Sequence, residues 1–244
     1  MDRVLPALTD EELDAVRAER EGQAWLQGGF GLEGAPLAGP ASTRDISDTA
    51  FNLIVEFEVS SEATYTARYR APTWPQGQSG VTIGIGYDIG YVSRDGLHAD
   101  FDGAIPAAMI TALEKDIGVK GDPARALAAS LHGAVDVPWD AAIGVHRDKV
   151  IPRWTGLVER TLSNTDALTD DQLGALVSLT YNRGASFTAQ GDRYTQMRAI
   201  HQHMAASNFG AIPGDLRDMK KIWPTVPGLQ KRREREALLF ETGL

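Results

Sequence analysis

Cysteine is missing from the whole 244-residue chain, and long apolar runs are missing too. Without cysteine, the protein forms no disulfide, uses no thiolate nucleophile and holds no Cys-ligated metal. No stretch of about 18 apolar residues occurs, so we expect no membrane insertion. The N-terminus has no basic region followed by an apolar core, and we therefore expect synthesis in the cytoplasm without a signal peptide.

The chain also lacks an excess of positive charge: acidic residues outnumber basic ones, and the formal net charge is −9. A chain without a basic face is poorly suited to bind phosphates, so we expect no nucleic-acid partner. The C-terminal segment is a local exception, but acidic residues interrupt its basic ones, which favours a solvated helix face. These basic residues are Lys220, Lys221, Lys231, Arg232, Arg233 and Arg235.

Motifs for metals and nucleotides are also absent. None of the five histidines belongs to a His-Glu-x-x-His motif, and we interpret them as surface residues, so no metal site is predicted. Gly84 and Gly86 lack the third glycine of a dinucleotide-binding loop, and no Walker loop occurs. We expect the protein to use no cofactor.

The first 42 residues differ from the rest of the chain. Thr9 and Glu12 form a capping box, which predicts a short helix to about Arg20. Glycine and proline are frequent from residue 27 to residue 42, which is typical of a linker or an irregular arm. We therefore predict an N-terminal helix with an arm over residues 1–42 and a main domain over residues 43–244.

Residues 81–88 show the clearest strand pattern, because apolar and polar or glycine positions alternate there. We interpret Gly84 and Gly86 as positions where a ligand approaches the backbone; a tightly packed hairpin is the alternative. A second strand is predicted over residues 64–70, so that the two strands form a β-hairpin with a broad tip.

Helical spacing of apolar residues predominates in the rest of the main domain, which indicates an α+β plan with one small hairpin region among many helices. Asp45 or Ser47 is expected to cap the first of these helices. The other predicted helices are a pair within 107–131 that is broken at 118–122, a segment over 138–162 with a break at Pro152, a central buried helix from Thr169 to Gly184, and helices over 194–204 and from Gly228 to Phe240.

Glu58 stands out among the carboxylates because it continues the apolar stripe of the first helix, in register with Phe51, Ile54 and Val55. Partial desolvation at such a position favours the protonated form of a carboxyl, which is what a general acid needs. The alternative is a carboxylate at the end of a helix that simply reaches solvent. Glu56 is expected to face water.

A second carboxylate is needed for glycoside hydrolysis by an acid and a base. Residues 63–87 contain no Asp or Glu, so Asp88 is the first acid after Glu62. Thr82 lies six residues before it on the same face of the predicted strand and is suited to holding a water beside Asp88.

These motifs together resemble the phage-type lysozymes, glycoside hydrolase family 24. The run from Thr82 to Gly86, Thr-Ile-Gly-Ile-Gly, follows a helix that ends in Glu, as in that family. Residues 175–184, which end in Asn182-Arg-Gly, are similar to its central helix, and residues 228–240, with paired arginines and a Glu, to its closing helix. The resemblance covers roughly residues 45–244 and implies a mostly helical fold whose small β-hairpin lobe forms one wall of the active-site cleft.

The order of the polar residues departs from the commonest pattern of that family, in which the catalytic Asp lies between the Glu and the Thr. The order Glu58, Thr82, Asp88 is more similar to the pesticin branch of the lysozyme superfamily. This resemblance implies a muramidase, which cleaves the β-1,4 bond between N-acetylmuramic acid and N-acetylglucosamine of peptidoglycan. It implies substrate contacts by a further set of residues, namely Tyr87, Gly84, Gly86 and Asn182.

The expected mechanism is inverting. Glu58 protonates the glycosidic oxygen, and Asp88 activates a water that Thr82 holds, with about 6.5–9.5 Å between the two carboxyl groups. Two other functions stay open: a lytic transglycosylase with a lone catalytic Glu, and an inactive peptidoglycan-binding or virion structural module. For all three we expect a monomer that acts on the bacterial cell wall after release from the cell that makes it, and a phage origin is one possibility.

Overall fold

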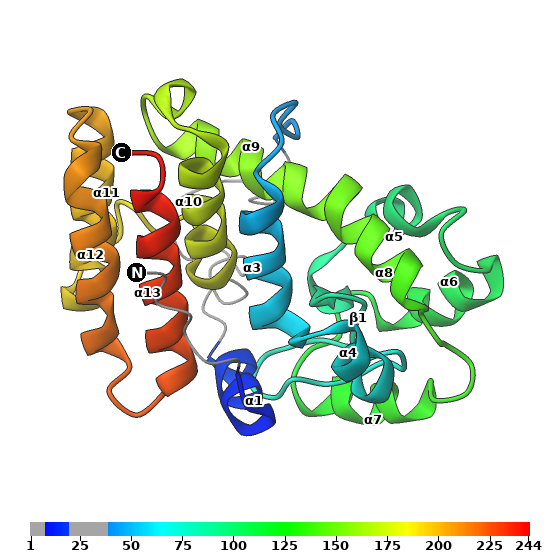
Figure 1. Cartoon of the computed structure of the whole chain (residues 1–244). Helices are drawn as coiled ribbons and strands as arrows, with labels where there is room; N and C mark the ends of the chain where they lie inside the picture. The colour runs from blue at the N-terminus through cyan, green and yellow to red at the C-terminus, as the bar shows by residue number, and fades with distance from the viewer. Residues whose placement is uncertain (1–7, 20–38) are drawn as a thin grey trace. The chain divides into compact units, whose positions relative to one another are not determined.

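The computed structural model describes residues 8–19 and 39–244, which form mostly helices and one small antiparallel sheet (Figure 1). The predicted α+β class is therefore confirmed. Within the described residues, no helix combines the length and the apolar character that crossing a bilayer requires. The chain divides into two compact units, which are described separately: unit 1 contains the residues up to 57 and residues 151–244, and unit 2 contains residues 58–150.

The secondary structure of unit 1 consists of helices and 3₁₀ turns, without a β-strand among its described residues. The helix α3 (Asp48–Val59) supplies all but its last two residues to this unit, and the Ser47 side chain caps it by accepting the N–H of Ala50. The other elements are α1 (Asp10–Ala18), α9 (Ile151–Thr161), α10 (Asp170–Arg183), α11 (Thr195–Ala205), α12 (Ile212–Asp218), α13 (Pro227–Glu241) and the 3₁₀ turns η4 (Thr165–Ala167), η5 (Asp192–Tyr194), η6 (Phe209–Ala211) and η7 (Met219–Ile222).

The core of unit 1 is built on α10, which lies beside α13 and α9 (Figure 1). A capping box of Thr169 and Gln172 starts this helix, and Gly184, at φ 72°, ends it. Every residue from Gln172 to Arg183 is buried, so the prediction of a central buried helix is confirmed. At Gly174 a side-chain carbon would lie 2.1 Å from Cβ of Ala50, so only glycine lets α3 approach this closely.

The helix of the predicted N-terminal segment packs against the last helix of the same unit. The capping box of α1 is present, and Leu13 and Val16 are almost fully buried. At Gly228 of α13, a side-chain carbon would lie 2.6 Å from Val16, and Lys231 pairs with Glu12 at 2.8 Å. This helix is thus part of the unit 1 core, whereas residues 20–38, which include most of the predicted arm, lie outside the described residues.

Shortening Val16 tests whether α1 contributes to the stability of unit 1. We expect Val16→Ala to lower the free energy of unfolding by about 1–2 kcal/mol, because two buried methyl groups are lost and a cavity is left. Urea unfolding followed by circular dichroism measures the change, with Ala18→Ser on the exposed end of α1 as the control. Equal stability of the two variants would show that α1 is an appendage with no part in the core.

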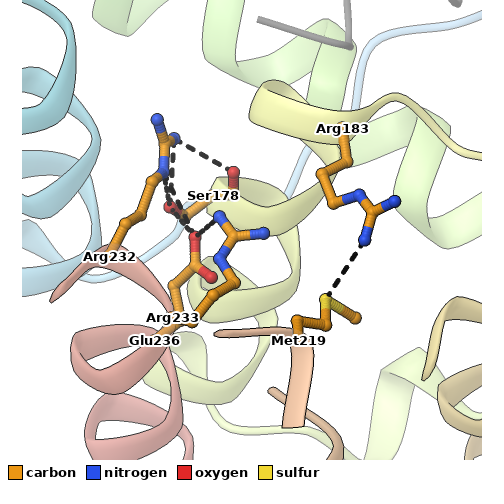
Figure 2. A network of polar contacts seen from close by, with 6 residues as sticks. All are labelled: Ser178, Arg183, Met219, Arg232, Arg233 and Glu236. Atoms are coloured by element: carbon orange, nitrogen blue, oxygen red, sulfur yellow. Dashed lines mark hydrogen bonds and ion pairs between the residues drawn. The ribbon is translucent and has the colours of Figure 1, made fainter. Parts of the chain in front are cut away.

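The basic C-terminal segment is not a solvated helix face, so that interpretation is wrong for two of its residues. Arg232 and Arg233 of α13 are both 0% exposed, and the equally buried Glu236 receives hydrogen bonds from both (Figure 2). Its Oε1 accepts from Arg233 at 2.8 Å, from Arg232 at 3.3 Å and from the Ser178 hydroxyl at 2.6 Å. Glu236, an acid of this basic segment, therefore forms ion pairs inside the protein. Charged residues three or four positions apart on a helix lie on the same face, and that face can be turned toward the core.

Trp223 extends this network toward the end of α10. The guanidinium carbons of Arg183 and Arg233 lie 5.0 Å and 5.8 Å from its ring centroid, within the range of a cation–π contact. Arg183 also donates to the sulfur of Met219 at 3.7 Å (Figure 2). It donates in addition to the backbone carbonyl of Arg193 at 3.0 Å. The inner faces of α10 and α13 are therefore joined by charged groups over an aromatic ring, in addition to apolar packing.

Unit 2 contains short helices around one hairpin, and its apolar core includes Ile83, Leu97, Phe101, Ile110 and Leu113. The two predicted helices within 107–131 are confirmed, with their break at the predicted place. The elements are α4 (Glu62–Arg68), β1 (Thr82–Ile83), β2 (Tyr87–Asp88), α5 (Arg94–Phe101), α6 (Ala107–Leu113), α7 (Asp122–Ser130), α8 (Trp139–Val145), the 3₁₀ turns η1 (Ile89–Tyr91) and η2 (Glu114–Asp116), and the π-helical turn η3 (His146–Val150).

Two sequence predictions fail in or next to unit 2. Residues 62–68 form the helix α4 and not a strand, because Ser61 caps them and the Tyr65 ring packs 5.3 Å from that of Trp139. The predicted break at Pro152 is instead the π-helical turn η3, and Pro152 lies in the first turn of α9. That turn holds His146 only 2% exposed, so the interpretation of the histidines as surface residues is wrong for this one.

Candidate active site

The residues 81–88 form a tight hairpin and not one continuous strand. Strands β1 and β2 pair antiparallel, with Thr82 opposite Asp88 and Ile83 opposite Tyr87, so that residues 84–86 make the turn. Gly84 and Gly86 have φ values of +55° and +70°, a region that costs other L-residues about 1–2 kcal/mol each. The two glycines are therefore explained by the turn, as in the hairpin alternative, and the interpretation that they admit a ligand is not needed.

Substitution of Gly84 separates conformational strain from lack of space. An added carbon there would be 3.8 Å from Ala142, an ordinary contact, so the cost of Gly84→Ala comes from the positive φ alone. We expect Gly84→Ala to destabilise the protein by about 1–2 kcal/mol and Gly84→Asn by less, because Asn tolerates this conformation. Chemical denaturation of both variants checks the ranking; equal losses would contradict it.

Thr82 and Asp88 share one face of the hairpin, as the sequence predicted, because residues directly opposite in an antiparallel pair point to the same side. Both are buried, with 2% and 7% of their surface exposed. The Thr82 hydroxyl donates to the carbonyl of Gly80 over 3.4 Å, a long bond that a better acceptor would replace at little cost. The hairpin thus places a hydroxyl beside a carboxylate.

The carboxylate of Asp88 is held by backbone N–H groups at the end of β2. Gly80 N–H donates to both oxygens at 3.0 Å, and Gly90 N–H donates to Oδ1 at 2.9 Å. At Gly80 a side-chain carbon would lie 2.4 Å from Oδ1, so this approach also requires glycine. Asp88 consequently fixes the chain before β1 and the turn after β2, which is a structural role, and its role as a catalytic base stays a prediction.

Glu58 lies in the last turn of α3 and is only 1% exposed. Ser60, at φ +65°, ends the helix, and Ser61 caps α4, so the chain turns directly after the glutamate. The alternative of a carboxylate that reaches solvent is therefore wrong, and the expected desolvation is confirmed. Glu56 does not face open water either, because it pairs with Arg235 at 2.5 Å and its side chain is 26% exposed.

The other predicted site residues take different places. The hydroxyl of Tyr87 donates to Asp100 at 2.7 Å, and its ring packs edge-on against Phe101. Both the hydroxyl and the ring of Tyr87 thus contact other residues of unit 2. Gly84 and Gly86 form the hairpin turn. Asn182 belongs to unit 1, where it is 0% exposed and neither polar atom of its amide has a hydrogen-bond partner among the described residues.

Unit 2 holds a buried carboxylate that the sequence did not single out. Asp116, in η2, is 0% exposed, and neither of its oxygens has a hydrogen-bond partner in the described part of the chain. Burial raises the pKa of this carboxyl, and Lys115 opposes the shift. Its neighbours Glu114 and Lys115 are charged and half-buried or exposed, so no periodic pattern marked it as an internal residue.

A charged cluster on α5 and η2 stabilises the part of unit 2 that follows the hairpin. His98 contacts Glu114 at 2.8 Å and Asp102 at 3.1 Å, and Arg94 also pairs with Glu114. The hydrogen bond to Glu114 and that to Asp102 raise the pKa of His98, while the hydrogen bond from His98 lowers the pKa of Glu114. The attraction is therefore present at mildly acidic pH, where His98 is protonated and Glu114 is ionised, and it is lost as the pH rises through the raised pKa of His98.

A pocket of about 520 Å³ lies within unit 2 between the end of α5 and the α8–η3 segment. Its charged lining is mainly acidic, and no residue predicted for catalysis lines it. Asp100, which accepts the Tyr87 hydroxyl, links it to the hairpin. The lining includes Asp100, Asp102, Asp140, Asp148, Lys149 and Gly144.

Comparison with protein-family models and with curated proteins gives no match for this chain.

Proposed function

We propose that the protein is a muramidase, a lysozyme-like hydrolase of bacterial peptidoglycan. The observation that carries the proposal is the burial of Glu58 in the same compact unit as the hairpin that places Thr82 beside Asp88. Glycoside hydrolysis uses a pair of carboxyl groups, one of them as the general acid, and Glu58 and Asp88 supply such a pair within one compact unit. The described fold, mostly helical with one small hairpin, is compatible with the lysozyme-like architecture that the sequence motifs imply.

In the proposed reaction, the proton of Glu58 moves to the oxygen of the β-1,4 bond, and that C–O bond breaks as the oxygen leaves. Water then attacks the anomeric carbon from the opposite face, and Asp88 accepts one proton of that water. The Thr82 hydroxyl, whose present bond is long, orients the water. The products are two shorter glycan chains, one with a new reducing end of inverted configuration.

A second candidate, a lytic transglycosylase, is favoured by the bonding of Asp88. Both oxygens of Asp88 already accept hydrogen bonds from the backbone N–H groups of Gly80 and Gly90, so fewer acceptor positions are left for the proton of a water. Without a competent base, Glu58 would act alone, and the 6-hydroxyl of the N-acetylmuramic acid residue would replace water. Its product carries a 1,6-anhydro end and is lighter by one water than the hydrolytic product.

Mass spectrometry of fragments from purified peptidoglycan distinguishes these two reactions. For a muramidase we expect reducing ends only, and proton NMR of the first product shows the α-anomer if the reaction inverts. Anhydro ends would instead establish the transglycosylase. Undegraded peptidoglycan, with a wild-type protein shown to be folded, would contradict both and favour a binding or structural module.

The variant Asp88→Asn tests the second carboxylate. If Asp88 is the base, we expect turnover to fall by about 10²–10⁴-fold while reducing ends remain the product. If Asp88 only holds the turn, melting temperature falls, because an Asn side chain has one acceptor oxygen for the two glycine N–H groups, but turnover per folded molecule stays near that of the wild type. Thr82→Val, which removes only the hydroxyl, is the companion variant.

A further inference from the structure

We propose that unit 2 carries a binding site for the acidic glycopeptide part of peptidoglycan, made of Trp74, Tyr91, Lys120 and Arg125, which we call the platform. The proposal depends on the proposed function for the identity of its ligand, but not on the catalytic role of any residue. Its ligand class is an amino-sugar chain that carries peptide carboxylates. The platform contains two aromatic rings and two cations, and it contains none of the proposed catalytic residues.

The rings of the platform are fixed by their own polar atoms. The indole N–H of Trp74 donates to the carbonyl of Ser79 at 3.0 Å, and the hydroxyl of Tyr91 donates to the carbonyl of Gln78 at 2.7 Å. Both rings thus bond to consecutive residues of one turn, although they come from different parts of the chain. Both residues are half-buried, so part of each remains exposed to solvent. A fixed, partly exposed ring loses little entropy when a sugar stacks on it.

The cations of the platform lie on these rings, and no acid of residues 8–19 or 39–244 pairs with them. Lys120 Nζ is 3.9 Å from the centroid of the Tyr91 ring, and Arg125 Cζ is 5.9 Å from that of Trp74. Among the described residues, neither cation forms an ion pair or a hydrogen bond, whereas Arg70 and Arg94 of the same unit pair with Asp136 and Glu114. The chain has a net charge of −9, yet no acid of the described residues pairs with these two cations, which leaves them available to an anionic ligand.

The platform is joined to the hairpin by backbone bonds. Gly80 and Lys120 form an antiparallel bridge, and the N–H of Gly121 donates to the carbonyl of Ser79 at 3.0 Å. Asp88 binds the N–H groups of Gly80 and Gly90, the residues next to Ser79 and Tyr91. The buried carboxylate of Asp88 therefore holds the platform beside the hairpin. The hydrogen bonds that it accepts have this structural role whether or not Asp88 takes part in catalysis.

The chemistry of the platform selects an acidic glycopeptide over a neutral glycan. Aromatic rings contact the C–H face of a sugar, and a neutral polymer such as chitin offers that face as well. Only the peptide stems of peptidoglycan add free carboxylates, which lysine and arginine bind by charge-assisted hydrogen bonds. The cations are therefore the part of the platform that decides between these two ligands.

Calorimetric titration of the full chain tests the proposal. The probes are a disaccharide-tetrapeptide from peptidoglycan, the same compound with its carboxyl groups amidated, and neutral chitotetraose. All titrations use the Glu58→Gln background, so that no probe is cleaved. The variants are Trp74→Ala, the double variant Lys120→Ala with Arg125→Ala, and Lys115→Ala, an exposed lysine of the same unit, as the matched control.

We expect the dissociation constant for the acidic probe to rise about tenfold in the double variant and about tenfold in Trp74→Ala, and to stay unchanged in Lys115→Ala. Salt should weaken binding to the wild-type platform and not to the double variant. Equal affinity for the acidic and amidated probes, unchanged affinity of the double variant, or no binding of the acidic probe would each overturn the proposal. Binding without cleavage by the chain that retains Glu58 would overturn the proposed function and leave the platform intact.

Discussion

Glu58→Gln is expected to lower the rate of peptidoglycan cleavage by about 10²–10⁴-fold while the protein remains folded. The glutamine has nearly the same shape but carries no proton that it can give to the glycosidic oxygen. Its amide also suits a buried site, because it is neutral at every pH and avoids the cost of a buried charge. Loss of turbidity of a peptidoglycan suspension, followed by fragment analysis, measures the rate.

Glu56→Gln is the matched control, because it makes the same chemical change two residues away on the same helix. Glu56 pairs with Arg235, and its side chain is 26% exposed, so we expect a stability loss below about 1 kcal/mol and no loss of rate. Cleavage at the wild-type rate by folded Glu58→Gln would remove the general acid from the proposed mechanism, for the hydrolase and the transglycosylase alike.

Glu236→Ala should be the most destabilising of the substitutions considered for unit 1. Removing this carboxylate takes away the group that both Arg232 and Arg233 contact, although the two guanidiniums stay fully buried. Breaking a buried ion pair by removing one partner costs about 3–5 kcal/mol, mainly because the remaining charge is left without compensation. We therefore expect the midpoint of urea unfolding to fall sharply, and this midpoint is the quantity to measure.

Glu241→Ala provides the comparison for that effect. Glu241 also belongs to α13 and also pairs with an arginine, Arg217, but its side chain is 38% exposed. Water can solvate Arg217 after the change, so we expect a loss of less than about 1 kcal/mol. If both variants lose the same free energy, burial does not govern the strength of these pairs, and the account of the network in Figure 2 is wrong.

The sequence predicted best where local rules act alone. The capping boxes at Thr9 and Thr169 place their helices correctly, since the side chain and the N–H groups that it satisfies are only three residues apart. Helical spacing placed Glu58 on the apolar stripe of its helix, and the structure decided between burial and exposure. The shared face of Thr82 and Asp88 also followed, although the reason was a hairpin pairing and not one strand.

Predictions failed where two local signals compete. Residues 64–70 are rich in Thr and Tyr, which favours a strand, but the cap at Ser61 and the packing of Tyr65 on Trp139 make them helical. Residues 81–88 alternate as a strand does, yet two glycines at positive φ fold them back on themselves. Alternation over such a short stretch does not distinguish a strand from a hairpin, because both place every second side chain on one face.

By itself, the sequence determined the α+β class and most helix positions, and it singled out Glu58 as the candidate for a buried carboxyl. Only the tertiary structure decided which charges are internal and what each polar group binds. Arg232 and Arg233 are core residues because α13 packs against α10, and Asp88 binds two glycine N–H groups because the hairpin turn at residues 84–86 brings Gly80 beside it. Such contacts join residues far apart in the chain, and the free energy of burying a charge depends on those partners and not on its neighbours in sequence.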